Sequence, residues 1–324
     1  MAMSYDRRVP EALLAALLPG GFAHSLAEFG ASGMWALDLQ LRGLGEVKRQ
    51  HRATLYVGTT KVVDLHLRRG NFALSASPRF TTPANGWDPA WAHAHNAGWF
   101  ADRWPAVEVY LQRAIEQVVA GGRYVKEGMV QSAIGRFPAD GFTVLDREAV
   151  VSFGSQAEKD VCIAELSVRW LRALDRPDPP EWWKTRPDRL GDECDALAVS
   201  REGEILAIEV KPHTAPDTDI AWSVLQAGMY ADLFQRWADQ AGDTASAVLQ
   251  GMAEQRHQIG LAPEAQVKLA SPVKVVPVVA IDRRATDSAA YKLNEVLSTL
   301  RSAHLADDMR VRRVNLVGRL DPIE

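Results

Sequence analysis

Two short apolar segments in the second half of the chain carry charged residues where buried strands seldom hold them. Residues 194–199 and 205–210 are separated by a Ser-Arg-Glu-Gly sequence, a pattern that predicts a β-hairpin. Asp195 stands at the start of the first segment, and Glu209 and Lys211 stand at the end of the second. Because acids and lysines usually avoid apolar strands, this hairpin constrains the fold and the chemistry more than any other feature of the sequence.

The hairpin would bring these three side chains together at one end of a small sheet. Side chains alternate along a strand, so Glu209 and Lys211 share a face while Val210 points away. The turn returns Asp195 to a position near Glu209. Carboxylate oxygens suit Mg²⁺, which activates water for phosphodiester hydrolysis, and a lysine can hold that water and stabilise developing charge. A salt-bridged sheet edge is the purely structural interpretation of the same residues.

A second Glu-X-Lys sequence, Glu46-Val47-Lys48, serves as a comparison within the chain. It follows a Gly-Leu-Gly sequence rather than an apolar strand. The nearest upstream acid of interest, Asp38, is too close for an intervening strand and turn. We therefore expect no catalytic role for this copy.

The hairpin resembles a known superfamily. Asp195, thirteen intervening residues and then Glu209-Val210-Lys211 are similar to the motif of the PD-(D/E)XK nucleases, especially the nuclease domains of RecB-like and NucS-like endonucleases. In that superfamily the Asp and Glu bind one or two Mg²⁺ or Mn²⁺ ions, and the Lys assists the attacking water. The resemblance implies these roles for Asp195, Glu209 and Lys211, with the carbonyl of Val210 as an additional candidate metal ligand.

The resemblance extends to both flanking helices. A helix expected over residues 158–174 begins at Glu158, which best matches a glutamate that family members place near the metal; Glu165 is the second choice. Gln226 and Tyr230 lie four residues apart on the helix after the hairpin and so share a face. They resemble a Q-x-x-x-Y motif whose Gln and Tyr touch the substrate. Stabilisation of a helix N-terminus is the structural alternative for Glu158.

The motif also departs from the family pattern. The proline that precedes the family's aspartate is absent, and Asp192 and Glu193 offer competing acids, so the choice of Asp195 depends on strand register. His213 follows Lys211 closely and either reaches the site or lies in a solvent-facing loop.

The order of predicted elements favours two domains in the 324 residues. From residue 158 the order helix, strand, strand, helix, strand, helix, strand predicts a mixed α/β sandwich. The resemblance implies a restriction-endonuclease-like mixed sheet flanked by helices for residues 146–324. Residues 1–145 are expected to form an α+β domain of unknown fold that selects substrate or partner. Its predicted elements are helices at 11–18, 24–29, 105–121 and 126–135 and a meander of strands at 53–58, 62–67 and 72–77. A short hairpin is expected at 142–153.

Composition restricts how the chain could bind nucleic acid. There are 37 Lys and Arg against 41 Asp and Glu, for a net charge of −4, so binding would need a local basic patch. Residues 48–79 are the best candidate, because Asp64 is their only acid; a solvated face explains them equally well. Their basic residues are Lys48, Arg49, Arg52, Lys61, Arg68, Arg69 and Arg79.

The remaining features point to a cytoplasmic protein without a membrane partner. Cys162 and Cys194 have no metal-ligand spacing and are expected to be free thiols. The chain contains no apolar run of the roughly 20 residues that a membrane span needs.

The resemblance therefore implies a Mg²⁺- or Mn²⁺-dependent nuclease that acts on DNA in preference to RNA, in repair or in defence against foreign DNA. Two alternatives stay open: an RNA-directed nuclease, and a non-catalytic nucleic-acid- or protein-binding module that keeps the nuclease fold. The presence of Asp195, Glu209 and Lys211 argues against the second. A homodimer is expected if the substrate is duplex, because one site cuts one strand.

Overall fold

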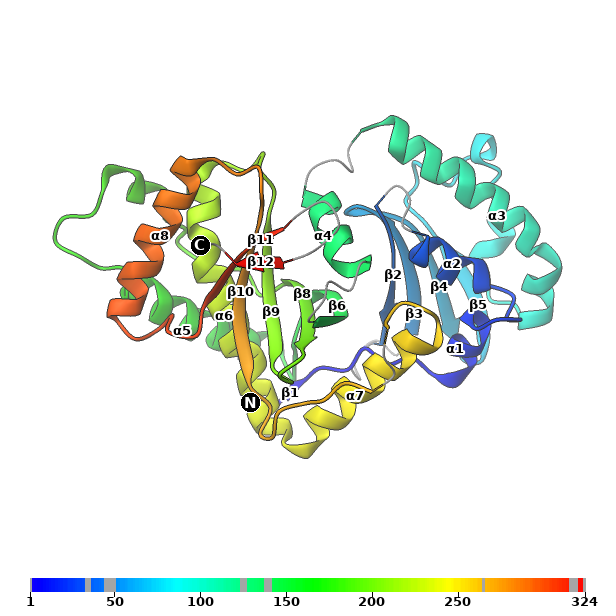
Figure 1. Cartoon of the computed structure of the whole chain (residues 1–324). Helices are drawn as coiled ribbons and strands as arrows, with labels where there is room; N and C mark the ends of the chain where they lie inside the picture. Colours follow the sequence, from blue (N-terminus) through cyan, green and yellow to red (C-terminus); the bar gives the residue numbers. More distant parts are fainter. Residues whose placement is uncertain are drawn as a thin grey trace. The chain divides into compact units, whose positions relative to one another are not determined.

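The computed structural model describes residues 2–32, 36–43, 51–122, 127–136, 142–263, 266–314 and 320–322. The chain forms two compact units, each with its own main sheet (Figure 1). The six-stranded unit comprises Met1–Tyr5, Ala139–Ala247 and Val267–Glu324, and the four-stranded unit comprises Asp6–Pro138 and Val248–Gln266. The protein is a mixed α/β protein, as the element order in the sequence predicts.

This division differs in three places from a single boundary at residues 145 and 146. Residues 142–145 belong to the six-stranded unit. The start of the chain belongs to the six-stranded unit, because β1 (Met3–Ser4) pairs with β7 (Ser152–Phe153) and the hydroxyl of Tyr5 donates to Asp146 Oδ2 at 2.9 Å. Helix α7 (Asp243–Gln258) begins in the six-stranded unit and ends in the four-stranded one. Neither connection leaves a short-range signal in the sequence.

The six-stranded sheet has the strand order β12-β11-β10-β9-β8-β6. Strands β9, β10 and β11 run parallel, whereas β6, β8 and β9 are antiparallel neighbours, as are β11 and β12. The sheet is therefore mixed, with the predicted β8–β9 hairpin near its centre. Its strands are β6 (Phe142–Ala149), β8 (Cys194–Ser200), β9 (Ile205–Lys211), β10 (Val275–Asp282), β11 (Arg310–Val314) and β12 (Leu320–Pro322).

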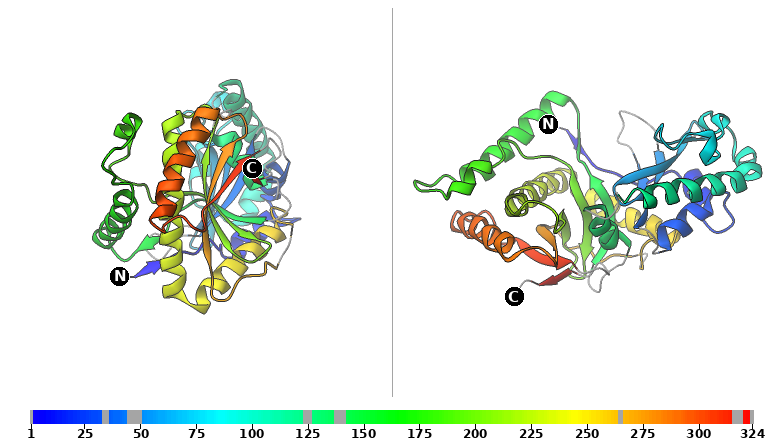
Figure 2. Two further views of the ribbon diagram at one scale, coloured as in Figure 1. Left: turned by 60° about the vertical axis from the view of Figure 1, so that its left-hand side comes forward. Right: turned by 90° about the horizontal axis from the view of Figure 1, so that it is seen from above.

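Three helices lie on one side of this sheet (Figure 2). Helices α6 (Asp217–Ala241) and α8 (Asp287–Ser302) make the crossovers that parallel strands require and pack side by side, and α6 also contacts β9 and β10. Helix α5 (Gln156–Arg172) packs against α6. Gly228 permits this approach, since a Cβ there would lie 2.2 Å from the ring of Trp170. Long α6 is thus enclosed on several sides and is apolar over most of its circumference.

The four-stranded unit contains an antiparallel meander, β2-β3-β4-β5. Leu39, Leu55 and Leu65 lie on its inner face and join a buried cluster with the helices. The three strands predicted from the sequence are confirmed, and β2 adds an unpredicted fourth. The strands are β2 (Leu37–Arg42), β3 (His51–Val57), β4 (Thr60–Arg68) and β5 (Asn71–Ser75), and the helices of at least seven residues are α1 (Glu11–Leu17), α2 (His24–Ala31), α3 (Ala97–Ala120) and α4 (Glu127–Arg136).

Two element predictions were wrong. The hairpin expected at 142–153 is instead the single strand β6, whose register with β8 shifts between Val144 and Asp146; tertiary bonds such as Tyr5 to Asp146 override the turn-like sequence. Helix α3 begins at Ala97, not at Pro105, because the side chain of Asn96 accepts a bond from the Trp99 amide at 2.8 Å and caps it. Pro105 lies on the exposed side of the helix interior.

None of the helices in the described parts of the chain is long and apolar enough to cross a membrane.

Candidate active site

The β8–β9 hairpin places Asp195 opposite Glu209. The last regular pair of this antiparallel ladder is Ala196 with Ile208, so the next position on each strand is occupied by an acid. There the carboxylate of Asp195 accepts a hydrogen bond from the Val210 amide, with an N–Oδ2 distance of 2.7 Å. The hairpin therefore brings the two carboxylates to one end of the sheet, as the sequence predicts.

Lys211 is ion-paired with Glu209 on the same strand. Its Nζ lies 2.6 Å from Glu209 Oε1, and Glu209 is 2% exposed. In the parallel ladder with β10, Glu209 and Lys211 are in register with Val279 and Ile281. A buried carboxylate among apolar neighbours requires a cation or several donors, and Lys211 supplies one.

Tyr230 of α6 lies close to these carboxylates. Burial is the main cause that raises the pKa of its phenol above the usual range, and the negative charges of Glu209 and Asp195 raise it further. The phenol therefore stays protonated and can donate a hydrogen bond at this end of the sheet. Gln226, one turn earlier on the same helix face, is half-buried.

Cys194 lies beneath the pair as a buried, protonated thiol. Burial raises its pKa, and Asp195 and Glu209 raise it further. Its Sγ contacts the carbonyl oxygens of Ala196 and Ile208 at 3.2 and 3.6 Å. The sequence predicts only a free thiol at Cys194 and gives no indication of this contact. Both cysteines are free and buried, as expected.

Glu158 lies in the first turn of α5, where its amide donates to the Ser155 side chain at 3.2 Å. Its Oε2 atom is buried without a hydrogen-bond partner among the described residues, and a Cβ on Gly154 would lie 2.9 Å from it. The next residue, Lys159, binds Asp192 at 2.5 Å. The start of α5 is thus tied to the segment that leads into β8.

The other acids weighed in the sequence have their own partners. Lys159 holds Asp192, one of the two acids that compete with Asp195. Glu165, the second choice on α5, is largely exposed and pairs with Arg236 at 2.9 Å. Hydrogen bonding to Arg236 lowers the pKa of this carboxyl. The register of the β8–β9 ladder makes Asp195 the acid that faces Glu209.

The donor set at the hairpin end suits a small hard cation. Mg²⁺ is commonly held by one or two carboxylates and completes its shell with water and phosphate oxygens, so Asp195 and Glu209 fit it, with the Val210 carbonyl as the additional candidate. Across the described ranges, no group of three or more His, Cys, Asp or Glu side chains is arranged to hold a metal ion. Glu158 accordingly does not complete a three-acid cluster with the pair.

His213 is directed to the neighbouring strand. Its Nδ1 lies 2.9 Å from Asp282 Oδ2 at the end of β10. Burial would raise the pKa of Asp282, but hydrogen bonds from Arg284 and His213 outweigh burial and lower the pKa to about 2. His213 thus belongs to an ion-paired group beside the hairpin end.

The basic stretch of the four-stranded unit is partly neutralised within its own sheet. Lys61 and Arg52 lie 2.7 and 3.5 Å from the carboxylate of Asp64. His66 is buried, and burial lowers its pKa to about 4. Arg68, Arg69 and Arg79 are exposed. Lys48, Arg49 and the comparison sequence Glu46-Val47-Lys48 lie outside the described residues.

Comparison with known proteins gave no match: no family model matches the chain, and neither a curated protein nor a solved structure is significantly similar to it.

Proposed function

We propose that the six-stranded unit is a Mg²⁺- or Mn²⁺-dependent nuclease of the restriction-endonuclease-like type, acting on DNA in preference to RNA. The observation that carries this proposal is the placement of Asp195 opposite Glu209, with Lys211 paired to Glu209, at one end of a buried hairpin. The mixed sheet with helices α5, α6 and α8 agrees with a fold of that type.

The roles follow from the chemistry of each side chain. Asp195 and Glu209 would hold the ion, with the Val210 carbonyl as the additional candidate. A bound Mg²⁺ or Mn²⁺ supplies neutralisation of the phosphate and activation of water. Lys211 balances the charge of Glu209 and is placed to orient the attacking water and stabilise charge on the phosphate oxygens.

Tyr230 and Gln226 are proposed to contact the substrate. The phenol of Tyr230 remains protonated because it is buried beside carboxylates, so it can donate to a phosphate oxygen. Gln226 lies one turn away on the same face and offers an amide that both donates and accepts. Their common face gives the substrate a polar contact on α6 opposite the acids.

The test is Mn²⁺-dependent cleavage of matched single-stranded DNA, duplex DNA and RNA by the wild type and by Lys211→Ala. Lys274→Ala is the matched control, because Lys274 is ion-paired with Glu204 at 3.4 Å in the same unit but outside the proposed site. We expect Lys211→Ala to cleave at least about 100-fold more slowly and Lys274→Ala to cleave like the wild type. Equal cleavage by all three proteins would contradict the assignment of the site.

Comparing the three substrates distinguishes the DNA nuclease from the alternative functions. Preferential cleavage of RNA would make the protein an RNA-directed nuclease with the same site. Binding of nucleic acid without cleavage by the wild type, in either metal, would favour a non-catalytic module. Cleavage of both strands of a duplex would call for sedimentation, with a homodimer as the expected state.

A further inference from the structure

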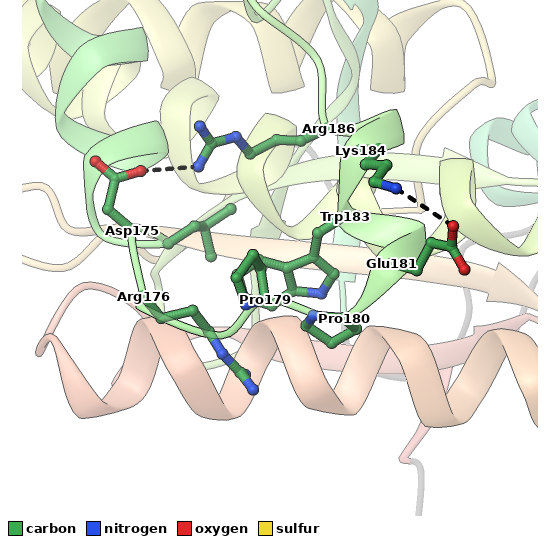
Figure 3. A pocket seen from close by; sticks show the side chains of 9 residues that line it. Asp175, Arg176, Pro179, Pro180, Glu181, Trp183, Lys184 and Arg186 are labelled. Carbon is green, nitrogen blue, oxygen red and sulfur yellow. Dashed lines mark hydrogen bonds and ion pairs between the residues drawn. The ribbon is translucent and has the colours of Figure 1, made fainter.

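The loop between α5 and β8 forms a cavity that is open to solvent on one side. Its volume is about 290 Å³, and every residue that lines it lies between Leu174 and Arg186 (Figure 3). Leu174, Pro179 and Trp183 form an apolar wall, and the 3₁₀ helix η4 (Glu181–Thr185) supplies one side. Three cations also line the cavity: Arg176, Lys184 and Arg186. No motif in the sequence indicates a role for this loop.

Trp183 in this wall has an unused donor. The side chain is buried, with 5% exposure, and its Nε1 has no hydrogen-bond partner among the described residues. Buried indole N–H groups normally find an acceptor. The guanidinium of Arg176 lies over the Trp183 ring, 5.1 Å from its centroid. The wall thus combines an aromatic ring, a stacked cation and a donor that lacks an acceptor.

Of the three cations, Arg186 is held firmly, by an ion pair with Asp175 at 3.0 Å and a hydrogen bond to the Leu171 carbonyl at 3.2 Å. Arg176 and Lys184 have longer ion pairs, and Arg176 Nε also donates to the Asp178 carbonyl at 3.1 Å. Lys184 lies 3.3 Å from Glu181, but both side chains are more than three-quarters exposed. Arg176 lies 3.5 Å from Glu295. Such pairs contribute little in water, so these two cations can exchange their ion-pair partners for an anion.

Helix α6 connects this cavity to the candidate active site. Trp222 packs against Trp183 with ring centroids 5.9 Å apart, and its Nε1 donates to Thr185 Oγ1 at 3.2 Å. Trp222, Gln226 and Tyr230 are spaced by four residues and therefore share a face. At 1.5 Å per residue, the eight positions from Trp222 to Tyr230 span about 12 Å. One helix face thus leads from the cavity to the carboxylates.

We propose that this cavity binds a nucleotide of a single-stranded nucleic acid. Arg176 and Lys184 contact its phosphate, the base lies against the apolar wall, and Trp183 Nε1 donates to an acceptor of the bound strand. Cationic grooves with aromatic side chains are the usual means of binding single strands. If the proposed nuclease function is correct, this cavity makes a single strand or a single-stranded end the substrate, and that step rests on the proposed function. Binding of the single strand by the cavity does not depend on catalysis.

The experiment measures fluorescence anisotropy of a labelled oligo-dT of about 12 nucleotides in EDTA, so that cleavage does not interfere. The variant is Arg176→Gln with Lys184→Gln. Arg103→Gln is the matched control, because Arg103 lies 4.2 Å from the ring centroid of Trp99 in the four-stranded unit. All three proteins are checked for folding by circular dichroism.

We expect the double variant to bind at least about 10-fold more weakly, and the control to bind like the wild type. The slope of log K against log[salt] should fall by about 0.7, since the two cations neutralise one phosphate and each neutralised phosphate of a single strand contributes about 0.7. A double variant with wild-type affinity and salt slope would overturn the proposal. So would a wild type that does not bind the oligonucleotide.

Three further probes identify the source of the phosphate: thymidine monophosphate, inorganic phosphate and a duplex of equal length. The proposal predicts that each binds more weakly than the single strand. Equal binding of the free nucleotide or phosphate would make this a small-molecule site, and equal binding of the duplex would exclude strand selectivity. If the wild type binds the oligonucleotide through the cavity but never cleaves it, the proposed nuclease function is contradicted and the proposed binding site stands. If the wild type cleaves but the cavity variant binds normally, the proposed binding site is contradicted and the nuclease function stands.

Discussion

The hairpin end of the six-stranded unit and the Asp64 network of the four-stranded unit use similar residues differently. Around Asp64, Thr54 and Lys61 donate to the carboxylate at 2.6 and 2.7 Å, and Ser75 donates at 3.2 Å. One acid is therefore surrounded by donors from three neighbouring strands. At the hairpin end two acids, Asp195 and Glu209, lie opposite each other. Two like charges placed opposite each other repel and destabilise the fold. A bound cation would relieve this repulsion, so the arrangement favours a cation site.

The two regions differ in position as well as in charge. Asp64 lies inside a strand, with ladder partners on both sides. Asp195 and Glu209 lie past the last regular pair of their hairpin, next to strand ends. An acid inside a ladder is solvated by its own sheet, whereas acids at a strand end can meet a ligand. The same residue types thus indicate structure in one unit and chemistry in the other.

The largest expected difference concerns activity. Glu209→Gln removes a proposed metal ligand and the counter-charge of Lys211, so we expect cleavage to fall about 1,000-fold. Asp64→Asn, the matched substitution in the other unit, should leave the cleavage rate per folded molecule unchanged. Steady-state cleavage at fixed Mn²⁺ checks both variants. A similar loss of cleavage in Glu209→Gln and Asp64→Asn would contradict the different roles proposed for the two regions.

The next effect is a pH dependence of stability that arises in the four-stranded unit. Burial lowers the pKa of His66 from its usual value of 6.5 to about 4, so between these values the unfolded chain binds a proton that the folded chain does not. The unfolding free energy should therefore fall by about 3 kcal/mol as the pH drops from 6.5 to 4. Urea unfolding across this range measures it.

His66→Gln should reduce that loss, because glutamine does not titrate. His304→Gln is the control, since the side chain of His304 is 87% exposed. An unchanged pH dependence in His66→Gln would show that other groups cause it.

A smaller loss of stability is expected from Asp64→Asn. Donors from Thr54, Lys61 and Ser75 would then face a neutral group, at a cost of about 2 kcal/mol. Burial raises the pKa of Asp64, but the hydrogen bonds outweigh it and the pKa is lowered. The carboxylate of the folded protein therefore contributes its full stability above the usual pKa of 3.8, and this contribution is lost as the pH falls through the lowered pKa of the folded state. The difference between wild type and variant should shrink below about pH 4; a constant difference would contradict this origin.

The smallest effect expected is that of Tyr230→Phe. Loss of the phenol removes one donor from the proposed site but keeps the buried ring, so cleavage should fall about 10-fold with little change in stability. Tyr291→Phe serves as the control, because Tyr291 is 69% exposed on α8. Wild-type cleavage by Tyr230→Phe would remove Tyr230 from the site.

Two short apolar runs and the turn-like sequence between them were sufficient to predict the β8–β9 hairpin. Strand geometry also predicts that Glu209 and Lys211 share a face and that the turn returns Asp195 near Glu209. The register, which decides between Asp195 and the neighbouring acids Asp192 and Glu193, is known only from the structure. The meander of the four-stranded unit was also predictable from its strands and turns. These features depend on neighbours in the sequence.

Features that depend on distant contacts could not be predicted. The two-residue strand β1 has no pattern of its own and exists because it pairs with β7. Strand β6 passes through a turn-like sequence because Asp146 is held by Tyr5. Cys194 and the ion pair of Lys159 with Asp192 join the candidate site through tertiary packing alone. No local propensity indicates any of these contacts.

We expect the hairpin end to bind a divalent cation and the Asp64 network not to bind one. Titration with Mn²⁺, followed by electron paramagnetic resonance of the free ion, measures this binding for the wild type, for Asp195→Asn with Glu209→Gln, and for Asp64→Asn. Binding should be saturable in the wild type and in Asp64→Asn, and it should be lost in the hairpin double variant. Equal binding by all three folded proteins, or no binding by the wild type, would contradict a metal site at the hairpin end.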